Sequence, residues 1–478
     1  MKVLTDEQIA ALRTIVLATT HANSHEVWSL LERVKLEGNR PNAIIDLLET
    51  LRQAGIIPNF LDGVGKSRIP GFDRLFWEPF SGLFASQELS NLVPGSLPRQ
   101  GLAQVWHVIS TQLANDVFTE LDPLIRDASL KGDVKGAQNL ANGYRDVVLE
   151  RISDVSDEQL AILGDTPESS LILDRLRPLL LANKLNNELW TGSQSRYGDM
   201  HENSIMHLTK CVRKQEAHDI KVGVELMLLN MSTLDKPFHI LRVVKKLLPT
   251  FDDIKIDTTP YGLIGRRILG LIHQQSQLIW EEYNKTIFNA QRMINALNRH
   301  ILLANGLSKS QLLNYLGPWQ QELTEICSRT GQILEDICEG AVTALEQVLP
   351  RESVRKGKIA TTILPRVSVK IDSEAVQVAR SYLEFLSAIR HLANEAGIAV
   401  VSQKVIKSCA DYLDFTADAL VQLVYENNPS RYLDDYIWAT TLLYSALDGN
   451  RAATGFERRI AALKSKQIKA TKMVPKGV

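Results

Sequence analysis

The spacing of apolar residues along the chain is helical almost throughout. Apolar residues recur every three or four positions in one segment after another, which places them on one face of an α-helix. Near the N-terminus, Thr5-Asp6-Glu7-Gln8 has the pattern of a capping box, and Ser24 and Pro41 are suited to begin two further helices, the last ending near Gly55. The pattern predicts an all-α fold that begins as a multi-helix array.

The array is predicted to continue to about Thr258. One helix face begins after Gly101 and should end at Asp122-Pro123, because proline interrupts a helix. A second helix is expected from Asp133 to Ile152, and Thr166-Pro167 has the pattern of an N-cap followed by proline at the first helical position.

Two long helices should follow the array. The segment from Tyr261 to Asn305 keeps apolar residues on one face, and Pro318 opens a second segment of the same kind that runs to Val348. Glycines punctuate the joint between them, so we expect an antiparallel, coiled-coil-like hairpin. A rod of this kind is more often a spacer or an assembly surface than a catalytic site.

The C-terminal part is predicted to be a three-helix unit followed by a basic tail. Three helices are expected at about 373–396, 398–426 and 430–447. The segment before them is rich in β-branched residues, but Pro365 lies in its middle, which indicates an edge strand or an extended linker. We interpret this segment as a basic connection between domains.

These predictions divide the chain into seven segments. They are an N-terminal helical unit (1–55), an aromatic and proline-rich packed segment (56–98), a helical array (99–258), a long helical hairpin (259–349), a basic linker (350–372), a C-terminal three-helix unit (373–450) and a basic tail (451–478).

The aromatic segment carries the least common motif of the chain. The pattern Phe-x-x-Leu-Phe occurs twice, eight residues apart, on either side of Pro79. The two copies and the tryptophan between them are the candidate partner-binding residues: Phe72, Leu75, Phe76, Trp77, Phe80, Leu83 and Phe84. They could dock in a groove of a partner, or form a clasp inside the protein next to Trp106, which the proline-rich context favours.

Charge is distributed unevenly, although the net charge is only −1. The segment 351–371 has six basic residues against Glu352 alone, and 451–478 has eight against Glu457 alone, so the rest of the chain is acidic. Basic segments can bind an anionic membrane or a nucleic acid, although a solvated, frayed terminus is the alternative for the tail. The candidate anion-binding residues are Arg355, Lys356, Lys358, Arg458, Arg459, Lys464 and Lys466.

Motifs for chemistry are few. On a helix, His207 and Cys211 could share one metal ion, but further ligands would have to come from elsewhere and solvated side chains are the alternative, so no metal site or cofactor is predicted. Gly63-Val64-Gly65-Lys66-Ser67 resembles the end of a phosphate-binding loop, but the required first glycine is replaced by Phe60. A catalytic site assembled in space remains open.

Composition bounds the class of protein. Of the 478 residues 45% are hydrophobic and 23% charged, which is ordinary for a soluble globular protein, and no run of about 18 apolar residues suggests a membrane span. Four scattered cysteines favour a reducing cytoplasm. We expect a non-catalytic helical scaffold or adaptor that binds a protein partner or forms a homo-oligomer, with anionic-surface binding as the alternative, and no small-molecule ligand.

Overall fold

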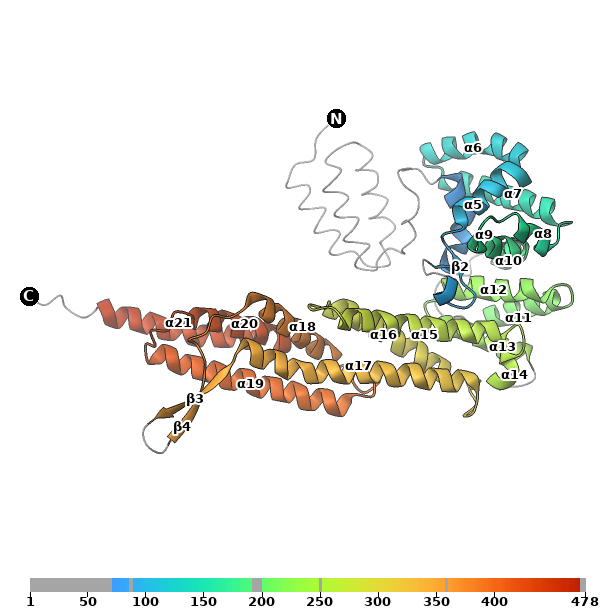
Figure 1. Cartoon of the computed structure of the whole chain (residues 1–478). Helices are drawn as coiled ribbons and strands as arrows, with labels where there is room; N and C mark the ends of the chain where they lie inside the picture. Colours follow the sequence, from blue (N-terminus) through green and yellow to red (C-terminus); the bar gives the residue numbers. More distant parts are fainter. Residues whose placement is uncertain (1–70, 86–88, 191–199, 249–251, 357–359, 473–478) are drawn as a thin grey trace, which may run out of the picture. The chain divides into compact units, whose positions relative to one another are not determined.

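A computed structural model describes residues 71–85, 89–190, 200–248, 252–356 and 360–472. The fold is all-α, as predicted: 76% of the structure is helical, only 3% is strand, and 18 helices lie in the described part of the chain (Figure 1). The predicted helices between Thr5 and Gly55 and the glycine-rich loop at 63–67 lie outside the described residues. Within those residues, no helix combines the length and hydrophobicity that are needed to cross a membrane.

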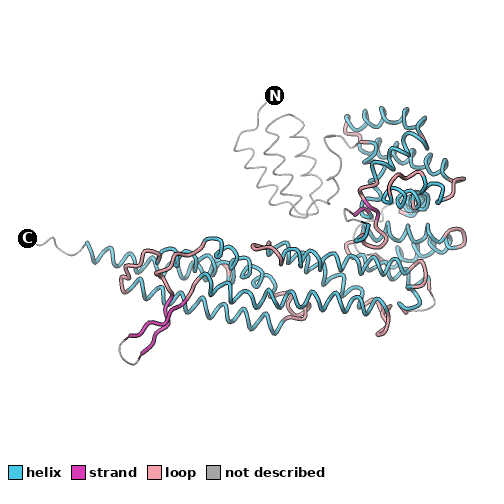
Figure 2. The backbone as a smooth tube through the Cα atoms, in the orientation of Figure 1, coloured by secondary structure: helices cyan, strands magenta, loops and turns pink. Residues whose placement is uncertain are grey.

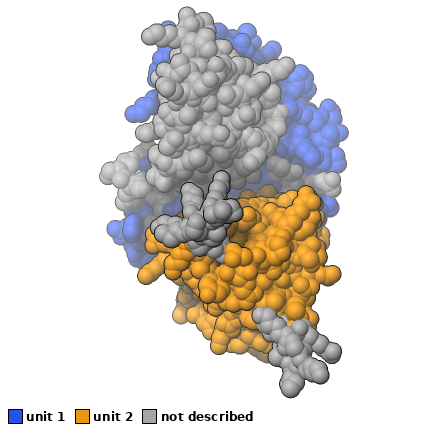
Figure 3. Space-filling view, turned by 90° about the vertical axis from the view of Figure 1, so that its left-hand side faces the viewer, with its two compact units in different colours: residues 1–267 blue, residues 268–478 orange. Residues whose placement is uncertain are grey.

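The chain divides between Arg267 and Ile268 into two compact units, which are coloured separately in Figure 3. This division differs from the seven predicted segments. The helices of unit 1 are α4 (Phe72–Trp77), α5 (Leu102–Val108), α6 (Asn115–Leu130), α7 (Val134–Ile152), α8 (Asp157–Ile162), α9 (Pro167–Asp174), α10 (Leu176–Leu189), α11 (Glu202–Glu216), α12 (Ile220–Thr233), α13 (Leu241–Leu247) and α14 (Asp253–Asp257). Short 3-10 turns add η1 (Glu78–Leu83), η2 (Leu89–Asn91) and η4 (Pro237–Ile240).

Unit 1 follows the predicted capping signals more closely than the predicted helix ends. Thr166 caps α9 with its side chain, as expected, and Asp133, which was expected to begin a helix, caps α7 with its side chain. The helix predicted from Gly101 to Asp122 is instead interrupted by the π-turn η3 (Ile109–Leu113) and a non-helical Ala114, and α6 then continues through Pro123. Proline removes only one backbone donor, and α6 retains its packing against α7. The expected stop at this proline was therefore wrong.

An irregular segment precedes α5. Its strands β1 (Phe84–Ala85) and β2 (Leu97–Pro98) pair in parallel, and Phe84 lies opposite Leu97. Helix α12 lies at the centre of unit 1, because every residue from Val222 to Met231 is buried.

Unit 2 is built from long helices that run alongside one another (Figures 1 and 2). They are α15 (Gly262–Tyr283, which begins in the last residues of unit 1), α16 (Ala290–Ser308), α17 (Pro318–Val348), α18 (Ser373–Ile389), α19 (Ala399–Tyr425), α20 (Leu433–Asp448) and α21 (Asn450–Lys472). One apolar core extends from Ile279 to Ile460. Helix α17 packs along α18 and α19, so the predicted hairpin and three-helix unit share a core rather than forming separate domains.

The single long helix predicted from Tyr261 to Asn305 is wrong. It is broken between Tyr283 and Ala290, where the Asn289 side chain accepts a hydrogen bond from the amide of Arg292 and caps α16. Asparagine competes with helical backbone bonds and favours caps. The break also places Phe288 in the core, with its ring centroid 5.1 Å from that of Tyr382.

Two expectations for the basic segments of unit 2 had alternatives. In the predicted basic linker the edge-strand alternative is confirmed and the extended linker is wrong, because β3 (Arg351–Lys356) pairs antiparallel with β4 (Ala360–Pro365), Arg351 opposite Pro365. Proline is tolerated there because it ends an edge strand. The frayed-terminus alternative for the tail is also wrong up to Lys472: α21 is helical, and its residues Ala453, Phe456 and Ile460 are buried.

Candidate functional site

A pocket of about 580 Å³ opens on unit 1, a volume in the range of known ligand sites. Its walls come from η2 and the loop after it, from α9, α10 and α12, and from the segment joining α14 to α15. The lining residues are Leu89, Leu92, Val93, Pro94, Gly95, Ser96, Leu171, Asp174, Arg175, Pro178, Lys221, Val224, Glu225, Asp257, Thr259, Pro260, Leu263 and Arg266. The lining is therefore mainly apolar, with charged groups from α9, α12, α14 and α15.

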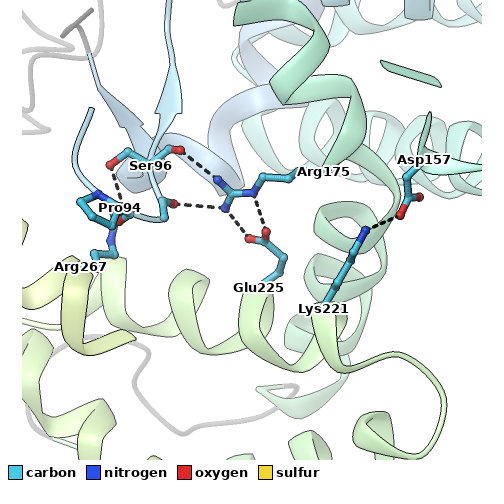
Figure 4. A network of polar contacts seen from close by, with 8 residues as sticks. Pro94, Ser96, Asp157, Arg175, Lys221, Glu225 and Arg267 are labelled. Carbon is cyan, nitrogen blue, oxygen red and sulfur yellow. Dashed lines mark hydrogen bonds and ion pairs between the residues drawn. The ribbon is translucent and has the colours of Figure 1, made fainter. Parts of the chain in front are cut away.

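A largely buried ion pair forms part of the lining of this pocket. The guanidinium of Arg175 donates from Nε to Glu225 Oε1 at 2.6 Å and from Nη2 to Oε2 at 2.8 Å (Figure 4). Glu225 is only 5% exposed. Two parallel bonds of this kind fix the orientation of both side chains, so α12 is locked to the junction between α9 and α10.

The same arginine also holds the loop that forms one wall. Arg175 donates to the carbonyl oxygens of Ser96 at 2.9 Å and Gly95 at 3.2 Å. Gly95 has a φ of +74°, which L side chains adopt at a cost, and a Cβ there would lie 3.1 Å from Leu228. Glycine is thus required for the loop to turn against α12.

Arg267 holds the other side of this loop. It donates to Ser96 Oγ at 2.8 Å, to the Pro94 carbonyl at 3.5 Å and to the Gly82 carbonyl at 2.9 Å. Burial, with a smaller effect of Arg175 and against the opposing effect of Glu225, lowers the pKa of Arg267 to about 10. Arg267 is therefore still a cation at neutral pH, stabilised mainly by neutral oxygen acceptors.

Three other charged residues of the lining, Lys221, Asp257 and Arg266, also form ion pairs. Asp157 accepts from Arg177 at 2.6 Å and from Lys221 at 2.9 Å, and this hydrogen bond raises the pKa of Lys221 despite partial burial. Arg266 donates from Nε and Nη2 to the two carboxylate oxygens of Asp257, each at 2.7 Å. These contacts join α8 to α12 and α14 to α15.

The Phe-x-x-Leu-Phe doublet lies away from the pocket lining, in α4, η1 and β1. Phe72, Leu75, Phe76, Trp77, Phe80 and Leu83 are buried and Phe84 is partly buried. The ring centroid of Phe72 is 4.7 Å from that of Tyr144 and 5.3 Å from that of Trp106. Docking in a partner's groove would need these side chains to be exposed, whereas an internal clasp requires the burial that is found.

The predicted anion-binding residues fall on two elements of unit 2. Arg355 and Lys356 end β3, and Lys358 lies outside the described residues. On α21, Arg458 and Lys466 are exposed, whereas Arg459 pairs with Asp418 at 2.7 Å and Lys464 with Asp434 at 2.6 Å. The basic face of α21 is thus partly neutralised by α19 and α20.

His207 and Cys211 both lie on α11. His207 is exposed, and the free thiol of Cys211 is half-buried, which raises its pKa and favours the neutral form. A thiol binds metal as the thiolate. No cluster of three or more potential ligands occurs among the described residues.

The pocket and its charged residues were missed by the sequence analysis. Glu225 could have been noticed, because it is the only charged residue in the apolar run from Val222 to Met231, and a charge in such a helix needs a buried partner. Its partner Arg175 is 50 positions away and bears no local signal.

Comparisons with models of protein families, with curated proteins and with solved structures found no match to this chain. The case for a function therefore rests on the geometry of the chain itself.

Proposed function

We propose that the protein is a non-catalytic helical adaptor that binds a segment of a partner protein in the pocket of unit 1. The observation that supports this function most directly is the apolar lining of the pocket, together with the rigid support beneath it. Arg175 and Arg267 hold the loop Pro94–Ser96 from two sides, so the wall is formed before a partner arrives. A preformed site loses little conformational entropy on binding.

The groups in the pocket are suited to binding rather than to bond breaking. Among the described lining residues, Ser96 accepts from Arg267 and the Thr259 hydroxyl donates to the Ile256 carbonyl. Glu225 is occupied by Arg175. A nucleophile would need a base within hydrogen-bond reach, and neither hydroxyl has one. The proposal places the protein in the cytoplasm, and the four free thiols are compatible with a reducing compartment.

A pocket-blocking variant tests this proposal. Leu171 lies half-buried on α9 and lines the pocket, so Leu171→Arg should fill it. Ile162→Arg makes the same change on neighbouring α8, where Ile162 is 80% exposed and outside the lining. Tagged full-length proteins would be incubated with native lysate and the bound proteins quantified by mass spectrometry.

A stoichiometric partner, or a second copy of the chain, should be recovered by the wild type and by Ile162→Arg and should be absent with Leu171→Arg. Recovery alone would not support the proposal. Equal recovery by all three proteins would place the contact elsewhere and contradict a role for the pocket.

The β3–β4 hairpin supports a second candidate function, binding of nucleic acid. The hairpin projects from the helices of unit 2 (Figure 2), and the segment 353–365 contains three basic residues and no acidic one. The major groove of DNA admits a two-stranded β-ribbon. The base of the hairpin is anchored, because the Arg351 guanidinium lies 3.4 Å from the ring centroid of Tyr412 and donates to its carbonyl at 2.8 Å.

Gel-shift titrations of duplex DNA at several salt concentrations test the second candidate. Replacing Arg355 and Lys356 by glutamine should weaken binding and reduce the salt dependence by about one ion for each phosphate that is no longer bound. Arg458→Gln with Lys466→Gln provides a control with the same reduction of charge on α21. Binding to anionic liposomes but not to DNA, or binding unchanged by the β3 substitutions, would contradict it.

A further inference from the structure

One charged group of the unit 1 pocket differs from the others. Arg175 is bound to Glu225, Arg266 to Asp257 and Lys221 to Asp157. Asp174, at the end of α9, also lines the pocket and is partly exposed. Within the described part of the chain, the Asp174 carboxylate takes part in no hydrogen bond or ion pair, so its oxygens are available to a bound group.

The cost of removing water from the Asp174 carboxylate restricts which chemical groups can bind next to it. A partner that fills the pocket displaces water from Asp174, and a desolvated carboxylate without a donor is costly. Lys221 acts on the Asp174 carboxylate through its charge, but its described hydrogen bond goes to Asp157. Arg266 donates to Asp257 with Nε and Nη2. A hydrogen-bond donor for Asp174 is therefore expected from the bound molecule.

The surroundings of Asp174 add an apolar requirement. Leu171 lies one helical turn before it on α9, and Val93, Val224 and Leu263 contribute apolar surface from three other segments. A small polar cation would leave the apolar lining in contact with water. An acidic ligand would be repelled by Asp174, and the cations that could bind it are already paired. An apolar group next to a cation satisfies both parts of the pocket.

We propose that the pocket receives a lysine or arginine side chain and an adjacent apolar side chain from the partner segment, and that Asp174 pairs with the cation. This inference rests on the proposed function, because it names the chemistry of the partner that the adaptor would bind. The ion pair would form in a partly dehydrated site, where charge-assisted hydrogen bonds are strongest.

Three labelled peptides of matched length test the proposal with the full-length chain: acetyl-Leu-Arg-Leu-amide, the same peptide with neutral citrulline in place of arginine, and the same peptide with glutamate. Binding would be followed by fluorescence anisotropy up to millimolar concentration. The arginine peptide should bind about tenfold more tightly than the citrulline peptide, and the glutamate peptide should bind most weakly.

Substitutions of Asp174 assign the preference to this residue. Asp174→Asn should remove the difference between the arginine and citrulline peptides, and Asp174→Lys should reverse it in favour of glutamate. Asp154→Asn, which neutralises an exposed carboxylate of unit 1 outside the lining, should leave the preference unchanged. Thermal unfolding of each variant checks that the fold is retained.

The outcomes separate this inference from the proposed function. Equal binding of the three peptides, blocked by Leu171→Arg, would overturn the cation preference but leave the pocket as a binding site. A preference for arginine that survives Asp174→Asn would place the carboxylate elsewhere and overturn the role of Asp174. Failure of all three peptides to bind would overturn the inference too, because the pocket would then not accept a basic side chain with apolar neighbours.

Discussion

The two units of this protein treat charge in different ways. Four charged side chains are buried in the described part of unit 1, whereas only one is buried in that of unit 2. The buried charged residues of the described chain are Arg145, Glu225, Asp253 and Arg267 in unit 1 and Glu282 in unit 2. Surface pairs of unit 2 include Arg380 with Glu384 and Arg459 with Asp418.

Backbone geometry explains this difference. The long helices of unit 2 satisfy their own amides and carbonyls, so their contacts can be apolar. Unit 1 contains the short elements and loops of 72–85 and 89–98, whose buried carbonyls need donors from elsewhere. Three arginines supply them: Arg145 donates to Leu75 and Phe76 oxygens, Arg175 to Gly95 and Ser96 oxygens, and Arg267 to Gly82 and Pro94 oxygens.

Arginine suits this task because its planar guanidinium offers five donors in a fixed geometry. The cost is that each cation must be compensated inside the fold. Arg175 is compensated by Glu225, and burial lowers the pKa of both Arg145 and Arg267 to about 10. The aromatic doublet and the pocket wall are thus both held by hydrogen bonds from an arginine side chain to backbone carbonyl oxygens, although they lie in different parts of unit 1.

The largest effect should come from Glu225→Gln. This change keeps the shape of the side chain but leaves the Arg175 cation buried without a carboxylate, next to Arg267. Breaking a buried pair in this way costs about 3–5 kcal/mol. Hydrogen exchange should show reduced protection across unit 1 and unchanged protection in unit 2. Arg175→Met on the same background removes the uncompensated cation but also its bonds to the Ser96 and Gly95 carbonyls. The double variant should therefore lose less stability than the sum of the two single variants; additive losses would mean that the pair does not act as a unit.

A smaller loss of stability is expected for Gly95→Ala, which alters the wall of the pocket. The left-handed backbone costs about 1–2 kcal/mol for any L side chain, and the new Cβ would also lie close to Leu228. Gly132 offers a matched control, since its φ is +75° but a Cβ added there would meet no atom within 4 Å. Urea unfolding should show a greater destabilisation for Gly95→Ala than for Gly132→Ala. Equal destabilisation would show that the contact with Leu228 adds nothing.

Unit 2 should respond to acid through its one described buried carboxylate. Burial opposes ionisation of Glu282, but hydrogen bonds from Lys285 and the Asn289 amide, with the charges of Lys285 and Arg292, outweigh it and lower its pKa. A lowered pKa stabilises the fold above the unfolded value of 4.5, and this stability is lost as pH falls through the folded value.

Wild type and Glu282→Gln should therefore differ in unit 2 stability at pH 6, and the difference should shrink below about pH 4.5. Hydrogen exchange at 284–289, between α15 and α16, provides the measurement. Glu384→Gln, at an exposed pair on α18, is the control and should show little change. A difference independent of pH would mean that Glu282 acts through its shape alone.

A structural feature could be predicted from the sequence when it is set by neighbouring residues, and was missed when it depends on residues far apart along the chain. The cap at Thr166 and the helix start near Asp133 were predicted because the start of a helix is set by neighbouring residues. The break before Ala290 has a local signal in the cap by Asn289, which the apolar spacing obscured. The packing of Phe288 against α18 that accompanies the break joins residues almost a hundred positions apart and has no local signal. The pocket was missed for the same reason, since its loop, Arg175 and Glu225 meet only in the folded chain.

The smallest effect should come from Lys464→Gln on α21. Lys464 and its partner Asp434 are 45% and 79% exposed, and a pair of this kind contributes about 0.5 kcal/mol or less. On the same helix, Ile460 is only 5% exposed, so Ile460→Ala should cost about 2–4 kcal/mol. Proteolysis of α21 under native conditions should therefore be accelerated by Ile460→Ala and hardly by Lys464→Gln. The reverse order would mean that α21 is held by charge, as the interior of unit 1 is, and the contrast between the two units would fail.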